Sequence, residues 1–396
     1  MTTRLYYTDP GLLEFEARVA DAGKHDDLYY TVLDQSAFYP TSGGQQYDTG
    51  QLDDVAIVDV IESDEGDVWH LSKHPVGEIG QTVSGKVDKE RRRRHQRQHT
   101  AQHILSQSFK ALYDFNTVSV HLGEEYGAIE FDTKSMDDDQ LARAEEYALS
   151  AVFENMPVEI FMVDAEKAAT LPLRKTPKRS GQIRVIKIGE FDWTPCGGTH
   201  CRTTAEVVLL KLVGTEKIRG HVLVKFLSGT QAVQDYLMRF KATDGLSQRL
   251  TCHVSDLPDK FDRLQNDNNS LRKELGRLNR EMLPVMASQL ADRAFAAGET
   301  RLVLEQLEQY DKKLMAQLAA AVAEAIDGVA ALYLEGRLVV SASETSGKDA
   351  GKLVAGLTSQ TGLKGGGSER QAQLGGSTPE QLAQFKDILI DLLTNE

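Results

Sequence analysis

The segment QHTAQHILSQSF, residues 98–109, lies within a stretch from 88 to 114 that the sequence predicts to be one long helix. Asp88 can cap its first turn, and its apolar residues form a stripe along one side: Ala101, Ile104, Leu105, Phe109 and Leu112. His99 and His103 differ by only ~40° in direction around the helix and lie on the polar side. A core histidine would be expected within the apolar stripe. The spacing therefore favours two imidazoles that reach one metal ion.

A second group of possible ligands follows further along the chain. In the segment Pro195-Cys196-Gly197-Gly198-Thr199-His200, a thiol and an imidazole lie four residues apart. The two glycines allow a tight loop that brings both side chains to one point. Nitrogen and thiolate ligands in a tetrahedral array suit zinc best. We therefore expect Zn²⁺ bound by His99, His103, Cys196 and His200. The alternative for the second pair is an ordinary turn with a buried thiol, and Cys201 is expected to be structural.

The composition is that of an ordinary globular protein, with 396 residues, 41% of them hydrophobic and 26% charged. This length is enough for two or three domains of ~100–200 residues each. With only three cysteines, Cys196, Cys201 and Cys252, a disulfide framework is implausible. No apolar run approaches the ~20 residues that span a bilayer, and Met1 is not followed by a signal sequence. We therefore expect a cytoplasmic protein without a membrane partner.

The formal net charge of −14 argues against indiscriminate binding to nucleic acid. Basic residues nevertheless gather near both halves of the expected zinc site. The first cluster comprises Lys86, Lys89, Arg91 to Arg94 and Arg97, and the second comprises Arg174, Lys175, Lys178, Arg179, Arg184 and Lys187. Either cluster alone could be a solvated helix face or a basic loop. Two clusters beside one metal site favour contact with phosphate.

The sequence predicts a mixed α+β multidomain protein in four parts. Residues 1–87 have β-rich runs at 28–33 and 56–61 around a loop at 39–44, which predicts a small barrel or sheet domain. Residues 88–245 predict an α+β core. Its expected helices are 88–114 and 138–154, and its expected strands are 127–131, 158–163, 183–188, 207–213 and 222–226. Residues 246–298 predict a helical connector, and residues 299–396 predict a compact α/β domain.

The connector carries a heptad pattern, with apolar residues alternately four and three apart. The seam consists of Leu257, Phe261, Leu264, Leu271, Leu275, Leu278 and Met282, with Asn268 as its polar position. Asparagine at such a position usually fixes register or partner number. The pattern predicts a coiled coil within one chain or between two, so a homodimer is possible. Pro284 is expected to bend or end this helix.

The last part predicts helices at 309–326 and 348–361, with a hairpin of residues 329–334 and 338–342 between them. A glycine-rich stretch from 365 to 376 then leads into a final helix. Backbone amides exposed by its glycines could meet phosphate or ribose. Tight packing on a helix is the alternative reason for the glycines.

The motifs described above resemble those of a known family. His99-Thr100-Ala101-Gln102-His103, followed by Cys196-Gly197-Gly198-Thr199-His200, resembles the paired zinc motif of alanyl-tRNA editing domains. Upstream, FYPTSGGQ at 38–45 is similar to the glycine-pair segment that precedes that domain. Downstream, GGG at 365–367 and AQLGG at 372–376 resemble the glycine motif of the C-terminal domain that alanyl-tRNA synthetases share with DHH-type phosphoesterases.

The resemblance covers essentially the whole chain, in the family's order, and it is to the free-standing alanyl-tRNA editing proteins of the large AlaX type. No class II synthetase region precedes the editing motif and no Asp-His-His cluster is present, so the resemblance implies editing without aminoacylation. It implies a trans-editing hydrolase, an aminoacyl-tRNA deacylase that removes serine, and also glycine, from mischarged alanine tRNA. The implied fold is a β-rich domain, an α+β editing core, a helical connector and an α/β tail domain that holds tRNA.

The implied reaction is attack of a zinc-associated water on the aminoacyl ester at the 3′-terminal adenosine. Zinc could polarise the carbonyl, lower the pKa of the water or anchor the substrate. Four protein ligands are typical of a closed, structural site, whereas catalytic zinc keeps an open position. The sequence leaves these roles open.

The family places its amino-acid pocket near residues 117–121, which makes Thr117 and Ser119 candidates, with solvent-facing strand residues as the alternative. Gly43 and Gly44 could shape the pocket or form a simple turn. The expected tRNA contacts are Arg93, Arg94, Arg174, Lys175, Lys178, Arg179, Arg219, Gly365, Gly366 and Gly367. For Arg219, a surface ion pair is the alternative.

Two other functions stay open. One is a zinc-dependent hydrolase of a small ester or nucleotide, against which the basic clusters count. The other is an RNA-binding module with structural zinc, which the closed ligand set supports. A fragment of a longer synthetase is a third reading, although Met1 leads directly into a plausible first strand.

Overall fold

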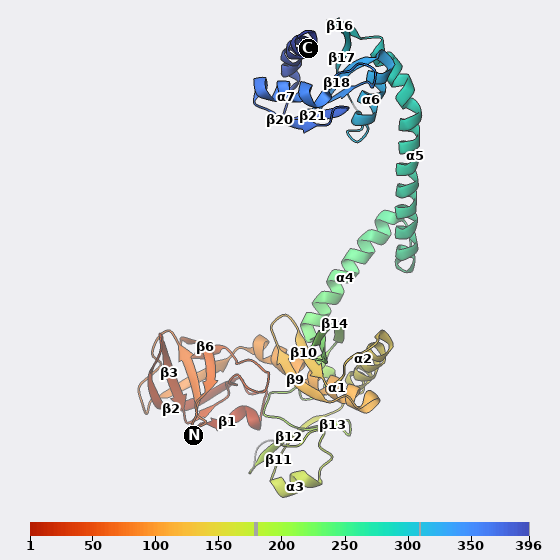
Figure 1. Cartoon of the computed structure of the whole chain (residues 1–396). Helices are drawn as coiled ribbons and strands as arrows, with labels where there is room; N and C mark the ends of the chain where they lie inside the picture. The colour runs from red at the N-terminus through yellow and green to blue at the C-terminus, as the bar shows by residue number, and fades with distance from the viewer. Residues whose placement is uncertain (178–180, 309, 396) are drawn as a thin grey trace. The chain divides into compact units, whose positions relative to one another are not determined.

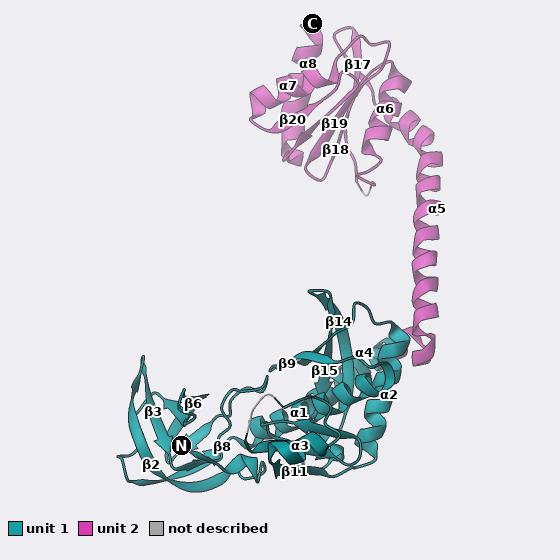
Figure 2. Cartoon of the chain, turned by 60° about the horizontal axis from the view of Figure 1, so that its bottom comes forward, with its two compact units in different colours: residues 1–246 teal, residues 247–396 magenta. Residues whose placement is uncertain are grey.

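The computed structural model describes residues 1–177, 181–308 and 310–395. It combines helices, open sheets and one closed barrel, so the predicted mixed α+β multidomain class is confirmed. The chain forms two compact units, residues 1–246 and residues 247–396 (Figure 2). None of the helices in the described part has the length and apolarity needed to span a bilayer.

A closed six-stranded barrel forms the first part of the N-terminal unit (Figure 1). Its strands, in order around the barrel, are β2 (Glu14–His25), β3 (Leu28–Leu33), β7 (Val68–Ser72), β6 (Val55–Glu62), β5 (Gly50–Leu52) and β8 (Thr82–Val87). Every second residue of β8 is buried, so Val83 and Val87 join the barrel core with Phe38 and Leu52. The short strands β1 (Thr3–Arg4) and β4 (Gln35–Ser36) pair in parallel, and the 3-10 turn η1 (Leu5–Tyr7) follows β1. The β-rich, barrel-like character predicted for this part of the chain is therefore observed.

The predicted long helix is α1 (Lys89–Tyr113). The Asp88 carboxylate accepts hydrogen bonds from the backbone N–H groups of Glu90 and Arg91, which confirms the predicted cap. Both sides of α1 are buried. Its apolar stripe packs in the core of the α+β part. Its histidine side contacts the segment 192–200 and the loop of residues 37–49 between β4 and β5, called the barrel loop below. Leu112, in the last turn, is the exception and is exposed.

Two antiparallel sheets complete the N-terminal unit. One has the order β14 (Leu210–Ile218), β15 (His221–Ser228), β10 (Gly127–Phe131) and β9 (Thr117–Leu122), and the other has the order β11 (Val158–Val163), β12 (Ile183–Ile188) and β13 (Asp192–Pro195). The helices are α2 (Asp138–Phe153), which packs on α1, then α3 (Ala165–Thr170) and α4 (Gly229–Leu250). The strand predicted at 207–213 begins only at Leu210, because Thr204–Val207 form the 3-10 turn η2.

The C-terminal unit begins with the 3-10 turn η3 (Val254–Asp256) and the long helix α5 (Leu257–Ala291). Its mixed sheet has the order β16 (Phe295–Ala297), β17 (Thr300–Gln306), β18 (Gly328–Leu334), β19 (Arg337–Ala342), β21 (Gln371–Gly375) and β20 (Lys364–Gly367). One apolar core joins this sheet to α6 (Met315–Ile326) and the end of α5. A second core joins it to α7 (Ala350–Thr361) and α8 (Leu382–Thr394), which follows the turn η4 (Pro379–Gln381).

Several expectations for this unit are wrong in detail. Helix α5 does not end at Pro284 but continues to Ala291, because Ala287 and Leu290 are buried in the core that includes α6 and keep the later turns helical. The helices predicted from 309 and 348 begin at Met315 and Ala350, and residue 309 lies outside the described residues. The glycines at 365–367 lie in the edge strand β20, where a Cβ at Gly367 would overlap Ala372 of β21.

Candidate metal centre

The structure brings the four predicted ligands together. One donor atom each from His99, His103, Cys196 and His200 lies within 4.8 Å of the others. The Cys196 Sγ atom lies 3.3 Å from His99 Nε2 and 3.5 Å from His200 Nε2. The histidines come from α1 and from the loop after β13, and all three rings are buried. The cluster is a group of donors able to bind a metal ion.

Each histidine ring is oriented through its Nδ1 atom. His99 Nδ1 lies 2.9 Å from Gln45 Oε1, and His103 Nδ1 lies 3.2 Å from Asp192 Oδ2. His200 Nδ1 lies 3.2 Å from Thr100 Oγ1. With Nδ1–H donating to these oxygens, the Nε2 atoms of all three rings are left as the electron-pair donors.

The donor spacing fits a tetrahedral ion. Zinc binds thiolate sulfur at ~2.3 Å and imidazole nitrogen at ~2.0 Å, which places sulfur and nitrogen roughly 3.6 Å apart in a tetrahedron. The observed separations of 3.3 and 3.5 Å come close to that value. These two separations are compatible with a shared ion, and all four donors lie within 4.8 Å of one another.

The pKa shifts of Cys196 and His200 are in the direction that a metal site requires. Burial favours the neutral thiol of Cys196, but His99 and His103 outweigh it and hold the pKa of Cys196 well below its ordinary value. Burial, with the charges of the neighbouring histidines, holds the pKa of His200 well below its ordinary value. A thiolate and neutral imidazoles are the forms that bind a metal ion.

Asp192 anchors His103 and is itself held on two further sides. Arg174 Nε donates to its Oδ1 atom at 2.8 Å, and the Thr194 hydroxyl donates to the same carboxylate at 2.9 Å. Burial raises the pKa of Asp192, but Arg174 and His103 outweigh it and hold that pKa below its ordinary value. Burial lowers the pKa of His103, whereas the bond to Asp192 raises it, and the net shift is upward. Arg174, which the sequence predicts as a tRNA contact, thus supports the metal-binding cluster by holding the Asp192 carboxylate.

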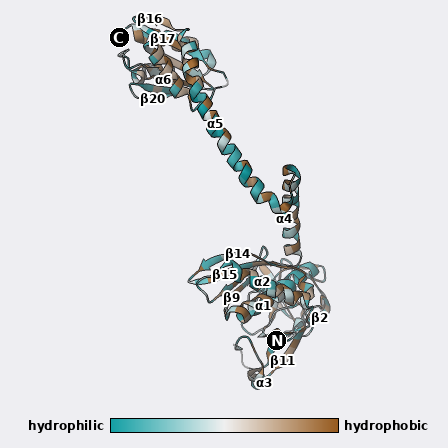
Figure 3. Ribbon diagram, turned by 90° about the vertical axis from the view of Figure 1, so that its right-hand side faces the viewer, coloured by the Kyte–Doolittle hydropathy of each residue, from teal (hydrophilic) through white to brown (hydrophobic). Residues whose placement is uncertain are grey.

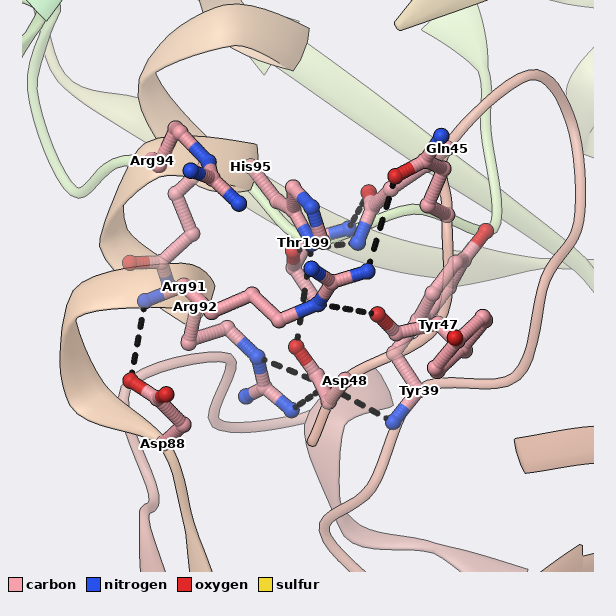
Figure 4. Close-up of polar contacts among 12 residues, drawn as sticks. Tyr39, Gln45, Tyr47, Asp48, Asp88, Arg91, Arg92, Arg94, His95 and Thr199 are labelled. Atoms are coloured by element: carbon pink, nitrogen blue, oxygen red, sulfur yellow. Dashed lines mark hydrogen bonds and ion pairs between the residues drawn. The ribbon is translucent and has the colours of Figure 1, made fainter. Parts of the chain in front are cut away.

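A second polar network ties the barrel to α1 (Figure 4). Gln45 accepts from the Thr199 backbone N–H at 3.1 Å and donates to the Thr199 hydroxyl at 3.0 Å. Nearby, Arg92 of α1 pairs with Asp48 at 2.5 Å, and both side chains are fully buried. Asp48 also accepts from the Tyr39 backbone N–H at 2.8 Å. The barrel loop therefore lies against the helix that carries His99 and His103.

Two glycines are required by this close packing. A Cβ at Gly198 would lie 2.1 Å from the His99 ring. At Gly44, where φ is +87°, a Cβ would lie 2.6 Å from the Val120 carbonyl oxygen of β9. Gly44 thus joins the barrel loop to β9, where the predicted pocket residues Thr117 and Ser119 lie.

The residues predicted for the amino-acid pocket are not gathered in one cavity. Gly43 lines a cavity of about 420 Å³ beside Cys196, but Gly44, Thr117 and Ser119 do not. The Thr117 hydroxyl donates to Ser106 Oγ at 2.8 Å, and the exposed Ser119 donates to Glu130 at 2.6 Å.

The residues predicted to contact tRNA are dispersed. Arg93 is exposed on α1, and Arg94 lies 3.9 Å from Glu124. Lys175 lines the cavity beside Cys196, and Arg219 is exposed in the turn between β14 and β15. Lys178 and Arg179 lie outside the described residues, and Gly365, Gly366 and Gly367 are exposed in the C-terminal unit.

Sequence reasoning missed Gln45, Thr100 and Asp192 as the residues that orient the histidine rings. Gln45 directly follows the glycine pair, and Thr100 lies between the two helical ligands, so their positions gave a signal. Asp192 had none, because it lies 89 residues from His103 in the chain.

Comparisons with known proteins identify relatives of this chain. Residues 183–222 match the family model described as "Threonyl and Alanyl tRNA synthetase second additional domain". "Alanyl-tRNA editing protein AlaX-L" of Pyrococcus horikoshii is 32% identical over 292 residues, covering 69% of this chain and 72% of that protein. "Alanine--tRNA ligase" of Archaeoglobus fulgidus is 31% identical over 386 residues, covering 94% of this chain. Among solved structures, the C-Ala domain from Aquifex aeolicus alanyl-tRNA synthetase matches 26% of this chain, with 18% identity and a TM-score of 0.23.

The two kinds of relative differ in how much of them the chain covers. It spans only 42% of the Archaeoglobus ligase, but it spans 72% of the Pyrococcus editing protein at 32% identity. The matched family segment also contains Cys196 and His200, two members of the metal-binding cluster. This chain belongs to the family of alanyl-tRNA editing proteins that includes AlaX-L.

Proposed function

We propose that this protein hydrolyses the ester bond of mischarged alanine tRNA, releasing serine and also glycine. The observation that carries the proposal is the group formed by three buried histidine rings and the half-buried Cys196 sulfur, in a chain related to AlaX-L. We propose zinc as the bound ion, because three nitrogen ligands and one sulfur ligand in a tetrahedral array suit zinc best.

The chain's own residues supply orientation. Gln45, Asp192 and Thr100 each hold one histidine ring, so the four donors need little rearrangement to bind an ion. A bound zinc ion supplies electrostatic stabilisation for an ester carbonyl or for the attacking water. Since an aminoacyl ester is already activated, positioning of the ester and the water is the main task left to the protein.

The remaining assignments extend this proposal. We assign tRNA contact to Arg93, Arg219, Lys175 and the exposed glycines of β20, and recognition of the amino acid to Thr117 together with Ser106 and Gln102. Gln102 donates to Ser106 at 2.7 Å in the same small network as Thr117. The four-part division at residues 1–87, 88–245, 246–298 and 299–396 is part of the proposal.

Helix α5 is proposed to pair with a second copy of itself. Its heptad seam is exposed along its length, with Phe261 at 62%, Leu271 at 70% and Leu275 at 57% exposure. In Figure 3 brown, hydrophobic positions recur along α5, which is otherwise mostly teal and hydrophilic. A coiled coil would bury the seam, with Asn268 facing its counterpart.

The test is deacylation of seryl-, glycyl- and alanyl-tRNA specific for alanine. The proposal expects loss of serine and glycine, with alanine spared, and at least ~100-fold slower loss in Cys196→Ala. Cys201→Ala is the matched control, because Cys201 is adjacent and buried but is not part of the cluster. Intact esters with the native protein would contradict the proposal.

A second function is favoured by one observation. Four protein donors surround one point, as in structural zinc sites, so the chain could bind RNA without hydrolysing it. Binding of uncharged alanine tRNA, with all three esters left intact, would support that function instead.

A further inference from the structure

The cavity of about 420 Å³ beside Cys196 carries two polar atoms that the site described so far does not use. Its walls come from the segment after β1, the barrel loop, β12 and the loop of residues 196–200 after β13, called the metal-binding loop below. Tyr6 and Arg184 both line it, and Tyr6 is fully buried while Arg184 is 6% exposed. Tyr6 Oη and Arg184 Nη2 are buried, and within the part of the chain that the structure describes neither atom has a hydrogen-bond partner. Both are donors that lack an acceptor.

The rest of the Arg184 guanidinium is fully engaged. Its Nη1 atom donates to the carbonyl oxygens of Cys196 at 2.7 Å and Gly198 at 2.9 Å. Its Nε atom donates to the backbone carbonyl oxygen of Tyr7 at 3.0 Å. These bonds fix the guanidinium against the metal-binding loop. Among the described residues, no carboxylate forms an ion pair with it, although a buried charge is costly without one.

Tyr6 is also held in place without using its hydroxyl. Its ring makes edge contacts with Tyr7 at 5.1 Å and Tyr39 at 5.2 Å between centroids. The neighbouring Arg4 donates to Tyr7 Oη and the Gly66 carbonyl and pairs with Glu62. A buried hydroxyl without a partner lowers the stability of the folded chain, so its presence calls for a ligand.

The charge of the cavity distinguishes between the two ends of the proposed substrate. Among the described residues, its lining includes Arg4, Lys175 and Arg184 and no acidic side chain, although the whole chain has a net charge of −14. An esterified amino acid carries a positive ammonium group, which such a lining repels. The nucleotide that bears the ester carries a negative phosphate, and three tyrosines offer apolar surface for its base and ribose.

We infer that Arg184 Nη2 and Tyr6 Oη bind the phosphate of the terminal nucleotide, whose nucleoside occupies the tyrosine-lined cavity. This inference rests on the proposed function. Both donor atoms are shielded from solvent. A phosphate therefore reaches them when neighbouring side chains change rotamer, as is common at interfaces.

The probes are adenosine 5′-monophosphate and adenosine, titrated calorimetrically into the full chain. The wild type is expected to bind the monophosphate about tenfold or more tightly than adenosine. Tyr6→Phe should weaken binding of the monophosphate by about tenfold, the value of one hydrogen bond to a charged group, and leave adenosine binding unchanged. Its melting temperature should stay equal or rise, because the variant removes an unpaired buried hydroxyl.

Tyr39→Phe is the matched control. Tyr39 lines the same cavity, but its hydroxyl already donates to the Ser42 carbonyl at 3.0 Å. This variant should lower the melting temperature and keep the affinity for the monophosphate within about twofold. Arg184→Lys, with metal content measured alongside, should lose the preference for the monophosphate over adenosine.

Equal affinity for the two probes, or an unchanged affinity in Tyr6→Phe, would overturn the inference. If the wild type also removes serine from tRNA in that case, the proposed function stands and only the phosphate site is wrong. If the monophosphate binds through Tyr6 but no ester is cleaved, the assignment to a terminal nucleotide fails together with the proposed function.

Discussion

At the scale of single residues, Gly198 shows how closely the metal-binding loop approaches α1. Because its missing Cβ would lie 2.1 Å from the His99 ring, Gly198→Ala should displace that ring and lower metal affinity by about 10- to 100-fold. Gly197→Ala is the control, since the nearest atom to its added Cβ is Tyr7 Oη at 3.6 Å. Competition with a coloured chelator measures both. Equal metal affinity in the two variants would contradict the packing described here.

His70 of the barrel predicts a pH dependence of stability. It is fully buried between the Thr31 carbonyl, 2.9 Å from Nδ1, and the Ser36 hydroxyl, 2.7 Å from Nε2. Burial lowers the pKa of His70 from 6.5 to about 4. Between these values the unfolded chain binds the proton and the folded chain does not, so stability falls as the pH falls from 6.5 to 4. The loss from this residue is about 3 kcal/mol.

Urea unfolding at a series of pH values tests this dependence. His70→Gln should be less stable than the wild type at pH 7.5, and the difference should shrink by about 3 kcal/mol by pH 4. His74→Gln, at an exposed position just beyond β7, should keep the wild-type profile. A constant difference between wild type and His70→Gln at all pH values would show that His70 does not titrate in this way.

Residue types and spacing were enough to predict the four ligands, because two of them share a helix face and two share a glycine loop. The residues that orient the rings could not be predicted in this way. Gln45 lies 54 residues from His99, and Asp192 lies 89 residues from His103. Such pairings depend on how the barrel loop and β13 pack on α1, and no local pattern encodes them.

At the scale of elements, the seam of α5 predicts self-association. Leu271→Asp combined with Leu278→Asp should weaken the dimer by at least ~100-fold, because each leucine loses its apolar contacts in the coiled coil. Asn269→Asp combined with Lys273→Asp changes residues outside the seam and should leave the dimer intact. Sedimentation equilibrium of the full chain distinguishes these outcomes. A monomeric wild type would contradict the pairing.

The elements also show where sequence patterns succeed and fail. The strands at 127–131, 158–163 and 183–188 match the structure residue for residue, since each is a short β-rich run bounded by polar or turn residues. Pro284 was expected to bend or end the helix, and of these two outcomes the end does not occur, because tertiary packing after the proline keeps α5 helical. The glycines at 365–367 were interpreted as a stretch whose amides could meet phosphate. They lie in an edge strand that the glycine pattern did not predict, and their contact with tRNA stays a prediction.

At the scale of the whole molecule, the N-terminal unit builds its centre from three separate parts. Gln45 comes from the barrel loop, His99 and His103 from α1, and Cys196 and His200 from the loop after β13. The buried Arg92–Asp48 pair fixes the barrel against α1. The metal-binding cluster therefore depends on the packing of the whole unit, yet many apolar contacts hold that unit together without an ion.

The central claim, that the metal centre performs the hydrolysis, is tested most directly by removing the ion and restoring it. The measurement is seryl-tRNA deacylation together with circular dichroism, on one sample before chelation, after chelation and after zinc is added back. The account predicts at least ~100-fold loss and full recovery of activity, with secondary structure retained throughout. Full activity without metal would contradict the claim, and so would collapse of the fold along with activity, since the zinc would then be structural.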